Sequence, residues 1–125
     1  MKAIIDLAPR SSVFATAAAQ LAAGGESDFR LHFESARALF SELTPARIEL
    51  LDTLRRQGAC SVYALAKAAG RNYSNVHGDI AALENLGLVA RDASENVTVP
   101  FESVEIRLCL ADAVARPVSV SEGKY

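Results

Sequence analysis

Apolar residues recur at two different spacings along this chain, and the change of spacing separates strands from helices. Residues 2–8 (KAIIDLA) are short, apolar and rich in Ile, which is typical of a strand, and Pro9 ends the segment. Residues 29–33 (FRLHF) alternate between apolar and polar and predict a second, half-buried strand. Between them, a Ser at 11 or 12 can cap a helix that stops at the glycine pair 24–25. Residues 1–43 are therefore expected to form a β-α-β unit that docks on the rest of the chain or on a second copy.

Helical spacing dominates from residue 34 onward, and local signals mark each helix. A brief helix over 34–41 leads to Thr44-Pro45, where Thr is the expected cap and Pro the first helical residue. Gly58 is expected to end that helix, and Ser61 to cap the next one, SVYALAKAA. The first of these two helices should turn three arginines towards solvent: Arg47, Arg55 and Arg56.

Gly70 provides a short, permissive turn before a further helix, and a hairpin follows that helix. An apolar stripe at helical spacing, formed by Val76, Ile80 and Leu83, predicts the buried side of the helix. Residues 88–90 are expected to pair with 97–99 around a polar tip, and the alternation over 104–110 predicts another strand. Residues 116–125 have no packing pattern and are expected to be a mobile tail.

This order of elements predicts an α+β fold: a winged helix-turn-helix over residues 44–115, preceded by the β-α-β dimerisation or docking element of residues 1–43. In a winged helix-turn-helix the second helix crosses the DNA backbone and the third lies in the major groove. Four polar residues face away from the apolar stripe near the start of the third helix: Tyr73, Ser74, Asn75 and His77. Asn can pair with adenine, Ser or Tyr can bond to a base or phosphate, and a helix N-terminus favours a phosphate.

The remaining candidate DNA contacts flank that helix. Arg71 and Asn72 precede it, Arg91 opens the predicted wing, and Ser61 and Lys67 belong to the second helix. Each position also has a purely structural interpretation. Asn72 can serve as a helix cap, Tyr73 as a half-buried packing residue and His77 as a solvated imidazole, while Arg91 can pair with Asp92 or Glu95. Gly78 has two interpretations. Its missing side chain can allow close approach of the helix backbone to DNA, or it can reflect sequence drift in a helix that no longer binds DNA strongly.

The net charge of the whole chain argues against binding to nucleic acid. The charge of the helical segment argues against such binding less strongly. The formal net charge is −2, whereas DNA-binding domains are usually basic. Residues 44–92 carry six basic and five acidic side chains, so the negative charge lies in the flanks. The placement of charge on the DNA face matters more than its total. Weak binding to random DNA and dependence on a specific site are expected.

Other function classes find little support in the sequence. No glycine-rich phosphate loop or Ser/His/Asp set is visible, so no enzymatic activity and no cofactor are expected. The two histidines and two cysteines fall in four different predicted elements, which argues against a metal site, and the cysteines are expected to be small buried hydrophobes. No membrane span or secretion leader is evident, which predicts a cytoplasmic protein.

The run from Leu43 to Phe101 resembles winged-helix regulators of the MarR-like class. It is more closely similar to the antitoxins of TumE-type toxin–antitoxin pairs, through an LTPxR start, a YxNVHxDIxxLExLGL helix and a VPF ending. These motifs cover about half of the chain. Members of the group often carry basic residues where this chain has Ser74 and Gly78.

Three functions follow as hypotheses. The first is a homodimeric, sequence-specific DNA-binding regulator, an autoregulating antitoxin that represses its own promoter and holds a cognate toxin through its terminal strands. The second is a winged-helix protein–protein adaptor without DNA binding, which the weak basicity and Gly78 motivate. The third is a ligand-responsive one-component regulator with a pocket between the two parts of the chain.

Overall fold

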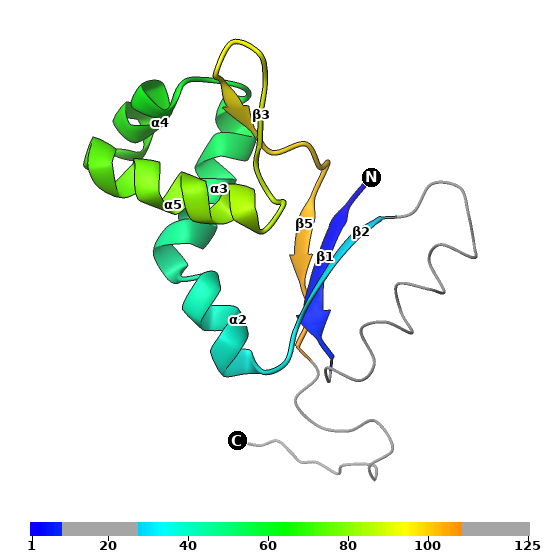
Figure 1. The fold of residues 1–125 in the computed structure, drawn as a ribbon. Coiled ribbons are helices and arrows are strands. Elements are labelled where there is room, and N and C mark those ends of the chain that lie inside the picture. Colours follow the sequence, from blue (N-terminus) through cyan, green and yellow to red (C-terminus); the bar gives the residue numbers. More distant parts are fainter. Residues whose placement is uncertain (9–27, 109–125) are drawn as a thin grey trace, which may run out of the picture.

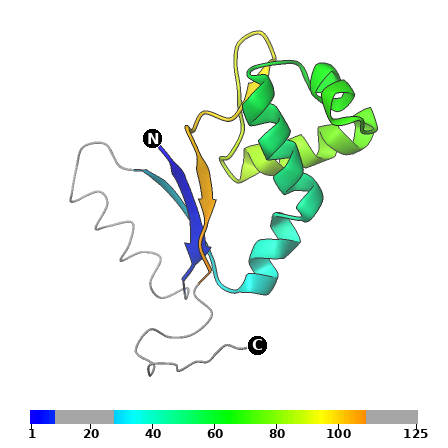
Figure 2. The same cartoon turned by 180° about the vertical axis from the view of Figure 1, so that it is seen from behind.

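The fold combines a small parallel sheet with a layer of helices. The structure is a computed structural model that describes residues 1–8 and 28–108, and its architecture is α+β. Three strands, β1 (Ala3–Leu7), β2 (Phe29–Phe33) and β5 (Val104–Ile106), form a sheet in the order β2-β1-β5 (Figure 1). The four helices of the described residues lie to one side of it, and a short hairpin lies at the end of the helical layer away from α2 (Figures 1 and 2).

Each described helix begins directly after a side chain that caps it. The helices are α2 (Ala36–Glu42), α3 (Pro45–Gln57), α4 (Val62–Ala69) and α5 (Tyr73–Asn85). Their caps are Ser35, Thr44, Ser61 and Asn72, and each cap oxygen accepts a backbone N–H three residues on, at 3.0–3.2 Å. The expected starts of α3 and α4 are confirmed. Helix α2 begins two residues later than expected because Ser35, and not an earlier residue, provides the cap.

The sheet is parallel throughout, with β1 in the middle. Ala3 lies opposite Phe29 of β2 and Val104 of β5, and Ile5 lies opposite Leu31 and Ile106. A parallel neighbour is what the expected β-α-β unit requires, although its helix, over residues 11–24, lies outside the described residues. The strand expected over 104–110 ends at Ile106. Its last two positions and the expected tail over 116–125 are also outside the described part.

One continuous core joins the sheet to the helices. Ile5 from β1, Leu54 from α3, Leu65 from α4 and Ile80 from α5 are all fully buried. Leu43, where the sequence suggested a junction between two parts, is fully buried as well. Because β5 follows the helices in the chain yet pairs with β1, the N-terminal strands and the helical segment share both a sheet and a core.

The hairpin consists of β3 (Ala90–Arg91) and β4 (Val97–Thr98), paired antiparallel with Ala90 opposite Thr98. This agrees with the expected pairing, although the strands are shorter. Cys60, in the α3–α4 connection, exchanges two backbone hydrogen bonds with Val97, of 2.8 and 3.2 Å. The hairpin is thereby fixed to the start of α4.

Gly87 marks the place where the sheet meets the end of α5. Its φ is +86°, and a Cβ there would lie 3.0 Å from Cζ of Phe29 on β2. The Phe29 ring also stacks on Phe101, with ring centroids 5.3 Å apart. Only a residue without a side chain fits both the backbone conformation and the contact.

Gly87 and Gly78 make a matched pair for testing this contact. Gly87→Ala should lower the free energy of unfolding by more than about 1 kcal/mol, because Ala is strained at positive φ and would press on Phe29. Gly78→Ala should instead raise it by up to about 1 kcal/mol, since Gly78 is helical and no atom lies within 4 Å of the added Cβ. Urea unfolding of both variants measures the difference. Effects of the same sign would contradict the described packing.

Candidate nucleic-acid interface

Helices α4 and α5 meet through a turn of three residues, Gly70, Arg71 and Asn72. Gly70 adopts the left-handed conformation, with φ 67° and ψ 35°, and its N–H closes the last turn of α4. Helix α5 buries the predicted stripe of Val76, Ile80 and Leu83 and leaves the opposite side to solvent. The turn and the helix therefore have the arrangement that the sequence predicted.

Four candidate residues lie on the exposed side of α5, as expected: Tyr73, Ser74, Asn75 and His77. The side chain of Tyr73 is 49% exposed, and its ring lies 5.8 Å from the imidazole of His77. A side chain that is about half exposed agrees with both interpretations of Tyr73, as a DNA contact and as a half-buried packing residue. No acidic residue occupies the first turn of α5, so this end of the helix keeps its attraction for an anion.

Helix α4 adds an aromatic residue that the sequence analysis did not single out. Tyr63 is 62% exposed, and Nζ of Lys67 lies 5.8 Å from the centre of its ring. The signal available in the sequence was the four-residue spacing of Tyr63 and Lys67 on the polar side of α4. We call the exposed side chains of Tyr63, Lys67, Tyr73, Ser74, Asn75 and His77 the α4–α5 surface.

Asn72 and Ser61 both act as helix caps. The Oδ1 atom of Asn72 accepts the N–H of Asn75 at 3.1 Å, and the hydroxyl of Ser61 accepts the N–H of Ala64 at 3.0 Å. The structural interpretation of Asn72 is confirmed. Capping occupies the oxygen of Asn72, whereas its NH₂ group takes no part in the cap and remains a donor.

Arg71 is bound to Asp79 of α5. Its Nη2 lies 2.8 Å from Oδ2 of Asp79, and Nε of Arg47 lies 3.0 Å from the other carboxylate oxygen. Arg47 is not part of the buried side of α3, as expected, but its side chain is only 22% exposed because Asp79 and the carbonyl of Glu42 both hold it. The three side chains, called the Asp79 cluster below, join α3, α5 and the turn between α4 and α5.

The surroundings of Asp79 favour its charged form. Burial by itself raises the pKa of this carboxyl, but hydrogen bonds and positive charge from Arg71 and Arg47 outweigh burial and hold the pKa below its ordinary value. The Nη1 atom of Arg71 is buried and makes no hydrogen bond within the described residues. The Arg71 guanidinium is therefore turned inward and does not have the open position expected of a phosphate contact.

Arg91 is held by an acid that the sequence analysis missed. Its Nε and Nη2 atoms bond to the two carboxylate oxygens of Glu84 at 3.1 and 2.8 Å, and Glu95 lies 3.5 Å from Nη1. The hydrogen bond from Arg91 lowers the pKa of Glu84, and the same bond raises the pKa of Arg91. Glu84 is about 14 Å along α5 from Asn75, so Arg91 lies at the far end of the helix from the α4–α5 surface.

These ion pairs define the chemistry of the surface. Of the three candidate cations, two have carboxylate partners, and Lys67 has no ion pair within the described residues. The α4–α5 surface thus offers neutral hydrogen-bonding groups, three aromatic rings and a single ammonium group. Such a set suits reading of base edges and stacking better than strong, sequence-independent attraction to phosphates.

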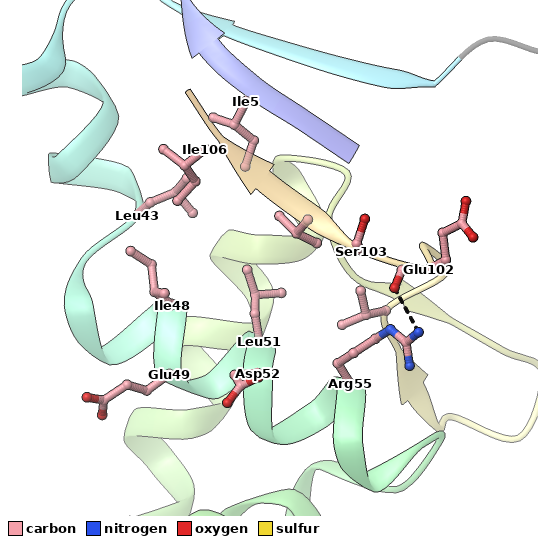
Figure 3. A pocket seen from close by; sticks show the side chains of 12 residues that line it. Ile5, Leu43, Ile48, Glu49, Leu51, Asp52, Arg55, Glu102, Ser103 and Ile106 are labelled. Atoms are coloured by element: carbon pink, nitrogen blue, oxygen red, sulfur yellow. Dashed lines mark hydrogen bonds between the residues drawn. The ribbon is translucent and has the colours of Figure 1, made fainter. Parts of the chain in front are cut away.

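A separate cavity of about 520 Å³ lies between α3 and the parallel sheet. Figure 3 shows Ile5, Leu43 and Ile106 on one side and Ile48 and Leu51 of α3 on the other. Arg55 closes one end, where its Nη2 donates to the carbonyl of Glu102 at 2.8 Å (Figure 3). A pocket between the two parts of the chain was one of the hypotheses from the sequence. No residue marked it there, because its walls come from three segments that are distant in the chain.

Three further structural findings concern metal binding, the thiol of Cys60 and membrane crossing. Within residues 1–8 and 28–108, no three His, Cys, Asp or Glu side chains are grouped so that they could hold a metal ion. Cys60 is half-buried, and burial raises the pKa of its thiol. None of the described helices combines the length and the apolar character that crossing a membrane requires.

The chain belongs to the HVO_A0114 family. The model of that family matches residues 42–106, just over half of the chain. The match starts at the last residue of α2 and ends with β5, so it includes the Asp79 cluster, the α4–α5 surface and every lining residue of the cavity except Ile5. No curated protein and no solved structure matched the sequence.

Asp79→Asn should lower the free energy of unfolding by about 1–3 kcal/mol at neutral pH, because an amide leaves the half-buried guanidinium of Arg71 without a counter-charge and leaves Arg47 only the carboxylate of Glu42, at 3.9 Å. A lowered pKa means that the Asp79 contribution is complete above the unfolded-state pKa of about 4 and is lost as the pH falls through the folded-state value. The difference between wild type and variant should therefore shrink in acid.

Urea unfolding between pH 3 and 7 measures this dependence, and Asp52→Asn provides the control. Asp52 forms an exposed pair with Arg56, for which a change within about 0.5 kcal/mol is expected. If the two variants lost equal stability at neutral pH, the Asp79 cluster would not have its assigned structural role.

Proposed function

We propose that the segment from α3 to β4 is a winged helix-turn-helix and that the protein is a homodimeric, sequence-specific DNA-binding transcriptional regulator in the cytoplasm. In this proposal α4 crosses the DNA backbone, α5 lies in the major groove and the β3–β4 hairpin is the wing. The observation that carries the proposal is the exposed row of hydrogen-bonding side chains on α5, opposite a fully buried apolar stripe.

The residues of the α4–α5 surface have the chemistry that this role needs. Asn75 is the proposed base-reading residue, since an amide can bond to adenine through both of its polar atoms. Ser74, His77 and Tyr73 provide further donors and acceptors, and the acid-free first turn of α5 favours a nearby phosphate. Lys67 and the NH₂ group of Asn72 are the proposed contacts to the DNA backbone.

Arg71 and Arg91 receive a different role from the one that the sequence suggested. Arg71 positions the start of α5 through Asp79, and Arg91 braces the hairpin against the end of α5 through Glu84. The side chains of Arg71 and Arg91 are similarly half-buried, at 29% and 28% exposed, so neither is proposed as a main contact to phosphate. We expect binding to random DNA to be weak, because few unpaired cations are available to release counterions.

The regulated promoter is proposed to be the protein's own, and the biological role that of an antitoxin. This part rests on the resemblance of residues 43–101 to antitoxins of TumE-type pairs. It is tested by sequencing the neighbouring genes and by co-purifying the tagged protein from cells that express the adjacent small reading frame. Absence of such a reading frame would remove the antitoxin role and leave the regulator proposal standing.

Two other functions are each favoured by one observation. A protein–protein adaptor is favoured by the pairing of Arg71 and Arg91 with acids, which leaves the surface nearly neutral. A ligand-responsive regulator is favoured by the cavity beside α3, because that helix also contributes Arg47 to the Asp79 cluster. A ligand that displaced α3 would act on α5 through that cluster.

DNA binding is tested by fluorescence anisotropy with a duplex from the protein's own upstream region and a scrambled duplex of equal length. The upstream duplex should bind more tightly. Asn75→Ala should weaken that specific complex by roughly 5- to 150-fold and barely affect the scrambled one. Lys67→Ala should weaken both complexes and lower the salt slope by about one.

Arg37→Ala is the matched control, since Arg37 is exposed on α2 (Figure 1), at a distance from α4 and α5, and its loss removes the same charge. It should leave both affinities unchanged. If wild type does not prefer the upstream duplex, or if Asn75→Ala binds as wild type does while circular dichroism shows a folded protein, the adaptor function becomes the better explanation.

A further inference from the structure

Strand β5 lies at an edge of the sheet, and its outer side has no partner among the described strands. Hydrogen bonds to β1 use the carbonyl of Ser103 and the N–H of Arg107, at 3.0 and 2.7 Å. Because backbone groups alternate in direction along a strand, those of Val104 and Ile106 point away from β1. Leu108 lies two residues beyond β5, and its backbone groups would point the same way if pairing with a second copy extended the strand to it. Figures 1 and 2 show β5 at the margin of the sheet nearest to α3.

The side chains of this strand are unusually apolar for an open edge. Ile106 and Leu108 are each 36% exposed, and Val104 and Ile106 line the cavity beside α3. An exposed apolar edge strand is a template for pairing with another chain unless charge, proline or a covering element protects it. Charge is present here: Glu105 forms ion pairs with Lys2 and Arg107 of its own chain, at 3.2 and 2.9 Å. The order of Glu105 and Arg107 is, however, also self-complementary between two antiparallel copies.

Two copies of β5 can pair antiparallel about a twofold axis that passes beside Ile106. Residue 104 then lies opposite 108 of the other copy, 105 opposite 107, and 106 opposite itself. This register places apolar residues opposite apolar ones and sets Glu105 against Arg107 twice. Every outward backbone group from 104 to 108 also finds its partner, since directly opposed residues in such a ladder exchange both hydrogen bonds.

Neighbouring registers lack this match. A shift of two residues in one direction puts Glu105 opposite Glu105, and a shift in the other direction puts Arg107 opposite Arg107, which cross-strand pairing disfavours. A shift of one residue sets apolar side chains against charged ones. The other edge of the sheet, β2, is less suitable, because antiparallel pairing centred on Leu31 would set Arg30 opposite His32.

We propose that β5 binds β5 of a second copy of this chain in that register, which makes one six-stranded sheet. The proposal assigns an interface to the homodimer proposed above, and this assignment does not depend on whether the protein binds DNA. The twofold axis stands perpendicular to the sheet, so the helical layers of both copies, and with them both α5 helices, lie on the same side. Leu108 of each copy faces Val104 of the other and covers the mouth of its cavity.

The test measures mass by sedimentation equilibrium and light scattering at micromolar concentration, without DNA, so that its result is independent of any DNA affinity. Wild type should be a dimer. Glu105→Arg and Arg107→Glu should each weaken dimerisation roughly tenfold or more, because each replaces two attractive cross-strand pairs by repulsive ones. An equimolar mixture of the two single variants should form a heterodimer, since Arg at 105 and 107 of one copy then meets Glu at 107 and 105 of the other.

Ile106→Pro provides a second variant that keeps the monomer fold. It removes an N–H that points outward and leaves the bonds to β1, which involve residues 103, 105 and 107, in place. Circular dichroism should show that the variant is folded, and sedimentation equilibrium should show that it is a monomer. A dimer that Ile106→Pro and both charge variants leave intact would place the interface elsewhere and overturn the proposal. An equimolar mixture of the two charge variants that stays monomeric would overturn it as well.

A monomeric wild type would also overturn it. If removal of residues 109–125 then produced a dimer, the edge would be covered by the chain's own C-terminal segment. If the shortened chain stayed monomeric, β5 would have no affinity for itself. Capture of a different protein by monomeric wild type, lost in Ile106→Pro, would assign the edge to that partner and count equally against self-pairing.

Discussion

The orientation of α5 depends on one carboxylate. Asp79 binds Arg47 from α3 with one oxygen and Arg71 from the α4–α5 turn with the other, so that three elements meet at a single side chain of α5. The apolar stripe fixes how deeply this helix packs, but close packing alone permits small rotations and shifts. Two charge-assisted hydrogen bonds with defined directions restrict these, which is the precision that a helix presented to a DNA groove requires.

This arrangement explains how a chain of net charge −2 can still present a surface suited to nucleic acid. Five of the eleven charged side chains in residues 44–92 form ion pairs with one another, in the Asp79 cluster and in the Glu84–Arg91 pair. The α4–α5 surface is left with neutral polar groups, aromatic rings and Lys67. Affinity would then rest on contacts to particular bases, and specificity would come at the expense of general attraction to DNA.

The sequence predicted what depends on local chemistry. Caps and glycines placed α3, α4 and α5 within a residue or two, and helical periodicity identified the buried stripe of α5 and hence its exposed side. The sequence did not predict the role of a residue where that role depends on a partner in another element. The pairing of β5 with β1, the Arg47–Asp79 pair and the cavity beside α3 join segments far apart in the chain. The Arg71–Asp79 and Glu84–Arg91 pairs span only eight and seven residues, but in each the two partners lie in different elements, so no helical spacing marks them. Only the Tyr63–Lys67 contact lay within reach of local spacing and was overlooked.

The central claim, that the α4–α5 surface reads DNA, is tested most directly by following backbone amide resonances while a duplex from the upstream region is added to the ¹⁵N-labelled protein. The account predicts that the largest shifts fall on residues 72–78 and on Lys67, with smaller ones at the β3–β4 hairpin, and that a scrambled duplex produces much weaker changes. Shifts confined to β5 and the cavity, or identical shifts with both duplexes, would contradict it.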